Sequence, residues 1–65
     1  MKVSEFKRWL KGQGCQIENL KGHYGVIYGG RKTVMPRHDS KELAQGTMFA
    51  ILDQLGLKEQ WKKRR

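Results

Sequence analysis

The sequence has little cysteine, histidine or proline: its 65 residues include one Cys, two His and one Pro. The single cysteine, Cys15, excludes an intramolecular disulfide and a cysteine-based metal cluster, and it suits a reducing compartment. Because only two histidines accompany it, we expect no zinc site, and we predict neither a metal nor a cofactor. Cys15 itself is predicted to be a small strand residue packed inward.

Long apolar runs are missing as well. No segment approaches the length needed to cross a membrane, and the first residues lack the apolar stretch of a signal peptide. The sequence therefore predicts a cytoplasmic protein without a membrane-spanning segment. With 65 residues, of which 37% are hydrophobic, we expect one domain with a small core.

Acidic residues are scarce. Six Asp and Glu face fourteen Lys and Arg, which gives a net charge of +8 and a pI of about 10.1. This imbalance predicts a polyanionic partner, which is a nucleic acid, an acidic membrane surface or an acidic protein. Charge alone does not choose among the three.

The first residues predict a helix. Ser4 is suited to cap it, and the negative charge of Glu5 in the first turn favours it. One helix face is apolar with spacing i, i+3, i+4, and glycines end the helix. The apolar face consists of Phe6, Trp9 and Leu10, and the glycines that end the helix are Gly12 and Gly14.

Three strands are predicted next. Residues 15–18 alternate apolar and polar, and residues 19–22 read as a turn. Residues 23–28 and 31–35 flank Gly29-Gly30, and a Gly-Gly pair accepts the positive φ angles that a tight hairpin turn demands. Pro36 then ends the last strand because it has no N–H to donate.

A polar loop, residues 37–46, separates the hairpin from a second helix, with one helical turn considered at residues 41–44. Thr47 is the expected cap, Gly56 the expected end, and the buried face is Met48, Ile51, Leu52 and Leu55. Residues 58–65 form a basic tail that reads either as an extra helical turn or as a disordered arm. In that tail, Trp61 either stacks on a base or docks on the domain.

Together these elements predict an α+β fold of order α-β-β-β-α. An antiparallel three-stranded sheet with both helices on one face would bury both apolar stripes.

The hairpin carries the residues best suited to chemistry. His23 begins a strand after Gly22, which allows close backbone approach, and Lys21 and Tyr24 add a charge and a hydroxyl. A neutral imidazole can take the proton of a ribose 2′-hydroxyl, so that attack on the adjacent phosphate gives a 2′,3′-cyclic phosphate without a metal. The alternative is a strand-end histidine that only contacts nucleic acid or solvent.

Other candidates bind rather than react. Arg31, Lys32 and Arg37 are the expected phosphate contacts, although Arg31 and Lys32 point to opposite faces of their strand. His38, past the end of the partner strand, is either the general acid, a phosphate contact or a cap. The ring of Tyr24 is a candidate for stacking on unpaired bases, against the alternative of half-buried packing.

Short motifs follow one another along the chain as far as Leu57: Ser4-Glu5-Phe6, Trp9-Leu10, Gly14, Gly22-His23, Val34-Met35-Pro36-Arg37-His38, Ile51-Leu52 and Leu55-Gly56-Leu57. In this order they resemble the HicA toxins of bacterial HicA–HicB toxin–antitoxin systems. The family commonly has Gly-Ser-(His or Asn)-His, where this chain has Lys21-Gly22-His23. The likeness implies a single domain at residues 1–57, followed by the tail at residues 58–65.

The resemblance also implies a fold like that of double-stranded-RNA-binding domains and a metal-independent ribonuclease that cuts mRNA, with His23 as its catalytic residue. A HicB-type antitoxin is implied as the partner, a membrane is not, and DNA would be contacted only through that antitoxin. Without the resemblance, two further readings stay open. The chain would be either a non-catalytic RNA-binding module or a subunit whose cations bind duplex DNA or an acidic protein.

Overall fold

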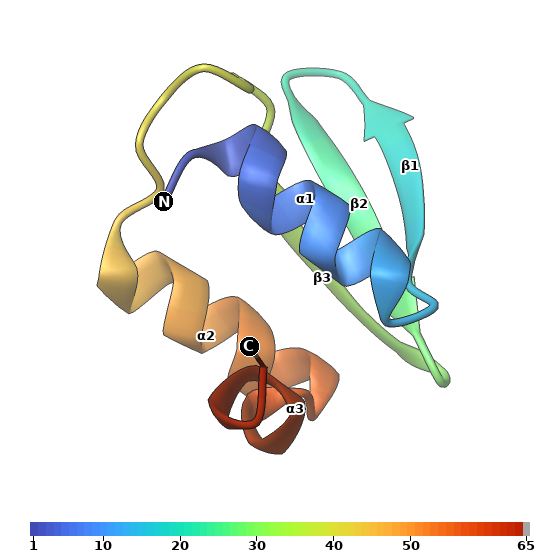
Figure 1. Cartoon of the computed structure of the whole chain (residues 1–65). Coiled ribbons are helices and arrows are strands. Elements are labelled where there is room, and N and C mark those ends of the chain that lie inside the picture. The colour runs from blue at the N-terminus through green and yellow to red at the C-terminus, as the bar shows by residue number, and fades with distance from the viewer. Residues whose placement is uncertain (65) are drawn as a thin grey trace.

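A computed structural model describes residues 1–64 of the chain. Its elements follow the order α1-β1-β2-β3-α2-α3, which adds one short helix to the predicted order (Figure 1). Their bounds are α1 Val3–Gly12, β1 Gln16–Leu20, β2 His23–Tyr28, β3 Arg31–Pro36, α2 Gln45–Leu55 and α3 Lys58–Lys62.

The sheet is antiparallel, with β2 between β1 and β3. Residues 19 and 20, expected in a turn, belong to β1, because Asn19 pairs with Tyr24 and Leu20 with His23. Only Lys21 and Gly22 form the turn, and Gly22 has a φ of 80°, which favours glycine. The predicted hairpin is confirmed, although Pro36 is the last residue of β3 rather than the first beyond it.

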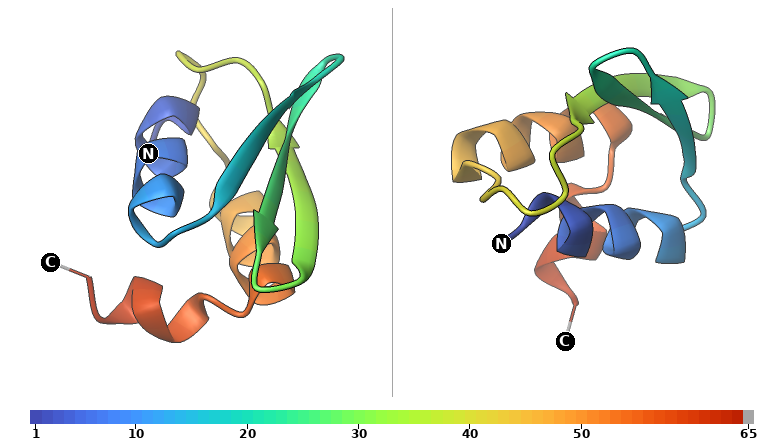
Figure 2. Two further views of the ribbon diagram at one scale, coloured as in Figure 1. Left: turned by 90° about the vertical axis from the view of Figure 1, so that its right-hand side faces the viewer. Right: turned by 90° about the horizontal axis from the view of Figure 1, so that it is seen from above.

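Both α1 and α2 lie on one face of the sheet, as predicted (Figure 2). The core between them contains the two predicted helix stripes and the inward residues of the central strand. On the same face of the sheet, the Thr33 hydroxyl of β3 donates a hydrogen bond to the side-chain oxygen of Gln54 in α2. The opposite face of the sheet has no helix over it within residues 1–64.

The helix starts differ from the predictions. Ser4 lies inside α1, whose N-cap is Lys2, and the free N–H groups of Val3 and Ser4 donate to the carbonyls of Lys41 and Asp39. Glu5 accepts from the Lys2 N–H at 2.8 Å, as its place in the first turn suggests. Carbonyl groups of a neighbouring loop therefore accept the hydrogen bonds of the free N–H groups at the helix end that Ser4 was expected to cap.

Helix α2 begins two residues before Thr47, with Ala44 as its N-cap. Residues 41–44 are not helical, since Glu42 forms an isolated bridge with Lys2. Gly56 ends α2 with a φ of 73°, as expected. Cys15 is packed inward but precedes β1, so its predicted place in a strand is wrong.

The segment after Leu57 folds back as α3. Trp61 is 5% exposed and meets Phe6 and Trp9 of α1 edge to face, with ring centroids 5.5 Å and 4.9 Å apart. Of the two readings for Trp61, docking on the domain is the one observed. Arg65 lies outside the described residues, and the division at residue 57 stays a prediction.

Candidate active site

His23 stands at one end of the exposed sheet face. It pairs with Leu20 on one side and Pro36 on the other, and residues paired directly opposite share a face. Its side chain is partly exposed. The same face continues with Gly25, where an added Cβ would lie 3.0 Å from Leu20 Cδ1. That Cβ would also lie 3.3 Å from Glu18 Oε1, so this face carries an apolar and an acidic side chain beyond His23. The partly exposed imidazole is open to a ligand from outside.

Arg37 comes from the segment that leaves β3 at this same end. Its guanidinium Nη1 donates to the Leu20 carbonyl at 3.4 Å, across the ends of all three strands. His38 follows two residues after Pro36, the strand partner of His23. The sheet thus gathers Lys21, Gly22, His23, Arg37 and His38 at one end, a group we call the histidine end.

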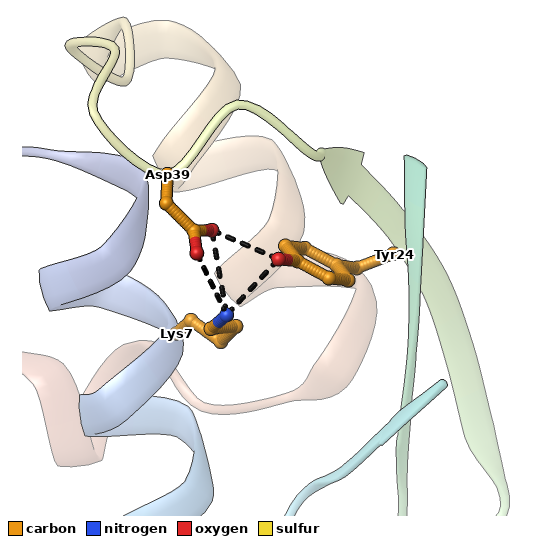
Figure 3. A network of polar contacts seen from close by, with 3 residues as sticks. All are labelled: Lys7, Tyr24 and Asp39. Atoms are coloured by element: carbon orange, nitrogen blue, oxygen red, sulfur yellow. Dashed lines mark hydrogen bonds and ion pairs between the residues drawn. The ribbon is translucent and has the colours of Figure 1, made fainter. Parts of the chain in front are cut away.

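A polar network holds the loop that carries Arg37 and His38 (Figure 3). The Tyr24 hydroxyl donates to Asp39 Oδ1 at 2.9 Å and accepts from Lys7 Nζ at 3.0 Å. Lys7 also pairs with Asp39 Oδ2 at 3.2 Å. Backbone bonds reinforce the contact, since the Ser4 N–H donates to the Asp39 carbonyl. Helix α1 and strand β2 therefore fix the residue that directly follows His38.

These contacts change acidities in consistent directions. The Tyr24 hydroxyl and the Lys7 ammonium hold the pKa of Asp39 below its ordinary value. The Tyr24 hydroxyl and the Asp39 carboxylate raise the pKa of Lys7. Both groups are therefore charged near neutral pH, and the network is complete there.

Tyr24 lies on the helix-facing side of β2, opposite to His23. Its ring is 9% exposed and belongs to the core, and Lys7 Nζ lies 4.3 Å from the ring centroid. The expected stacking of this ring on a base does not fit that placement. The packing alternative does fit it, with the hydroxyl engaged in the network.

Arg31 and Lys32 lie at the other end of the sheet, beside the β2–β3 turn. Lys32 shares the face of His23 but pairs with Ile27, and its ammonium is 3.9 Å from Glu18 Oε1. Arg31 is on the helix side, against Gly56. Neither cation is part of the histidine end, so any RNA contact they make is a separate one.

The network residues Lys7 and Asp39 were not among the predicted site residues. Lys7 directly follows Phe6 of the predicted apolar stripe, and Asp39 falls within the predicted polar loop at residues 37–46. Their meeting depends on long-range contacts over 32 positions of sequence. The sequence offered only a weak signal for it, which was an unmatched Lys beside the apolar face.

Two further observations concern metal-ligating side chains and the single thiol. Among residues 1–64, no cluster of three or more His, Cys, Asp or Glu is placed to hold a metal ion. Burial raises the pKa of Cys15, which disfavours a thiolate nucleophile. No helix within that range is long and apolar enough to span a membrane.

Comparison with known families gives the histidine end its context. A family model described as "HicA toxin of bacterial toxin-antitoxin" matches residues 3–57. The chain belongs to the HicA toxin family. HicA membership covers α1 through Leu57 and leaves α3 outside the matched range.

Similar proteins carry names that agree with that family. A "Probable mRNA interferase HicA" of Pseudomonas fluorescens is 48% identical over 60 residues, covering 91% of this chain and 100% of the relative. A "Probable mRNA interferase toxin HicA" of Escherichia coli (strain K12) is 47% identical over 57 residues, covering 88% and 98%. The toxin chain in a crystal structure of the E. coli HicAB toxin–antitoxin complex superposes with a TM-score of 0.84. It is 46% identical, and the match covers 88% of this chain and 100% of that one. The double-stranded-RNA-binding-like HicA fold expected from the sequence is confirmed.

Proposed function

We propose that the chain is the toxin of a HicA–HicB pair and a metal-independent endoribonuclease that cuts mRNA, with His23 as general base. The observation that carries the proposal is the place of His23, partly exposed at the end of an uncovered sheet face beside Arg37. Family membership and relatives named probable mRNA interferases support the same activity.

In the proposed step, a neutral His23 takes the proton of a ribose 2′-hydroxyl. The 2′-oxygen attacks the adjacent phosphorus, the bond to the 5′-oxygen breaks, and the products carry a 2′,3′-cyclic phosphate and a 5′-hydroxyl. The leaving 5′-oxygen needs a proton, and His38 is the candidate donor at this end of the sheet. Arg37 and Lys21 are the candidate phosphate contacts, because each adds positive charge beside the imidazole.

We propose a HicB-type antitoxin as the protein partner. The related E. coli toxin was solved as a toxin–antitoxin complex, and an acidic surface laid over the histidine end would offset part of the +8 charge. DNA would be contacted through the antitoxin rather than by this chain. Because mRNA is the proposed substrate, we infer that the protein acts in the cytoplasm.

The test is cleavage of a long unstructured RNA in EDTA by the unmodified chain, His23→Ala and His38→Ala. We expect the unmodified chain to leave cyclic phosphate ends, and His23→Ala to be slower by about 10²- to 10⁴-fold, the usual contribution of a general base. Circular dichroism would establish that each variant is folded.

Two results would contradict the proposal in different ways. Equal cutting by the unmodified chain and His23→Ala would remove His23 from the mechanism. Binding of intact RNA without any cutting would leave a non-catalytic RNA-binding module. If DNA of the same sequence bound equally well, recognition would not involve the 2′-hydroxyl.

A further inference from the structure

Helices α2 and α3 enclose a surface hollow away from the histidine end. Its volume is about 350 Å³, and its lining residues are Phe49, Lys58, Trp61 and Lys62. Phe49 is a large apolar side chain left 40% exposed. Three of the four lining residues follow Leu57, where the family match ends. The hollow is therefore a feature that HicA membership does not account for.

The hollow is lined on its inner side by the buried side chain of Trp61. Trp61 is anchored in the core by its edge-to-face contacts with Phe6 and Trp9. The Arg64 guanidinium covers that indole at 3.6 Å from the ring centroid, and Lys58 pairs with Asp53 at 3.5 Å. The buried indole holds α3 against α1, and Phe49 and Lys62 line the same hollow.

An exposed aromatic ring bordered by ammonium groups has the chemistry of single-stranded nucleic-acid binding. A base stacks on the ring, and the cations contact the phosphates on either side of it. We propose that the hollow binds one unpaired base and its flanking phosphate in the same RNA strand that the histidine end cleaves. The inference rests on the proposed function, since the substrate supplies the strand. The exposed cations Lys63 and Arg64 extend the positive surface next to the hollow.

The two sites are separated along the sheet and also across it, because His23 is on the uncovered face and the hollow lies among the helices that pack on the other face. The length of β2 is therefore a minimum distance between them. Gly56, just before α3, lies against Arg31 at the β2–β3 turn, where an added Cβ would be 3.3 Å from Arg31 Nη1. His23 is at the opposite end of β2, which as a six-residue strand is about 17 Å long at roughly 3.3 Å per residue. A stacked strand advances roughly 3.4 Å per nucleotide, so on the order of five nucleotides or more are needed between the sites. Arg31 and Lys32 lie near that path.

This separation makes RNA length the test. We would compare kcat/KM for an unstructured 20-nucleotide RNA and a 4-nucleotide RNA, using the unmodified chain, Phe49→Leu and Lys62→Gln. Phe49→Leu keeps the apolar bulk and loses the ring. We expect a loss of about tenfold on the long RNA, the scale of one lost base stack, and no change on the short RNA. Lys2→Gln is the matched control, because it removes the same charge at an exposed position far from α3.

Salt dependence gives a second readout, measured as binding of the 20-nucleotide RNA to the chain with His23→Ala. Adding Lys62→Gln should flatten the plot of log K against log salt concentration by about 0.7, the value of one phosphate contact in a single strand. Lys2→Gln should leave the slope unchanged. Melting temperatures of all variants would show that the fold is kept.

Each other outcome overturns the inference. If Phe49→Leu and Lys62→Gln have the same kcat/KM on the long RNA as the unmodified chain, the hollow does not bind RNA, while the proposed function stands. Equal losses on both RNA lengths would place the effect at the histidine end or in the fold. Unchanged RNA cleavage with weakened binding of a purified antitoxin would make the hollow a protein-docking surface. If the unmodified chain neither binds nor cuts RNA, the proposed function falls together with the inference.

Discussion

At the residue scale, the site depends on one aspartate that does not face the substrate. Asp39 directly follows His38, and its carboxylate contacts both the Tyr24 hydroxyl and the Lys7 ammonium. Its carbonyl accepts from α1 as well. The position of the loop therefore depends on a charge that sits behind the histidine end rather than in it.

We predict that Asp39→Asn destabilises the protein near neutral pH and has little effect in acid. The pKa of Asp39 is lowered in the folded chain. Its contribution is therefore present above the pKa of an unfolded aspartate, about 3.9, and is lost as pH falls through the folded value. Melting temperatures from pH 7 down to pH 3 would show the gap between the two proteins closing.

Asp53→Asn is the control for that series, because Asp53 forms only an exposed pair with Lys58 and such pairs contribute little. Tyr24→Phe, which removes one hydroxyl and keeps the buried ring, should cost about 1 kcal/mol. A gap between Asp39→Asn and the unmodified protein that stays constant down to pH 3 would contradict the proposed charge dependence.

At the scale of elements, the sequence pattern predicted the features that depend on neighbouring residues along the chain. The i, i+3, i+4 stripe of α1 and the Gly-Gly turn of the hairpin were both found as expected. Helix starts were missed, although Ser4 and Thr47 have good capping chemistry. Loop carbonyls satisfy the start of α1, and α2 begins before Thr47 with no side-chain cap. His23 and Arg37 were predicted as site residues from residue type, and they stay predictions, whereas Lys7 and Asp39 meet only through the tertiary fold.

Helix α3 is the element whose role the sequence left open. Its five residues are too few for a stable isolated helix, so its order depends on the burial of Trp61. The indole in turn shields the partly buried ring of Trp9. The short helix and the outer face of α1 therefore stabilise each other.

We predict that Trp61→Ala costs about 3–5 kcal/mol of unfolding free energy, the usual loss for a buried tryptophan. This is a large share of the stability of so small a domain. Urea denaturation followed by circular dichroism measures it. Gln60→Ala, on the exposed side of α3, is the matched control and should change stability by less than about 0.5 kcal/mol. A chain ending at Leu57 should lose as much as Trp61→Ala. An unchanged midpoint for that shorter chain would show that α3 does not support the core.

At the scale of the whole molecule, the excess of cations acts on stability as well as on binding. The chain carries a net charge of +8 within principal extents of 29 × 25 × 19 Å. At 0.01 M salt the Debye length is about 30 Å, so every cation repels every other across the molecule. At 0.1 M it is about 10 Å, and only neighbouring charges interact.

We therefore predict that the melting temperature rises when NaCl is increased from 0.01 to 0.1 M. Each kcal/mol of repulsion removed corresponds to about 4–8 °C for a domain of this size. Ion pairs such as Met1–Glu42 and Lys7–Asp39 weaken in salt and oppose the effect. With fourteen cations against six acidic residues, repulsion should outweigh them.

A variant of lower charge separates this repulsion from other salt effects. Lys2→Gln combined with Lys63→Gln removes two exposed charges and leaves +6 from the original +8. Since self-repulsion scales with the square of the net charge, the salt-induced rise should fall to roughly half. A melting temperature that drops on adding salt would mean that the ion pairs outweigh the repulsion. The charge excess would then act through binding alone, and the stability gained with a bound polyanion would come from direct contacts rather than from relief of repulsion.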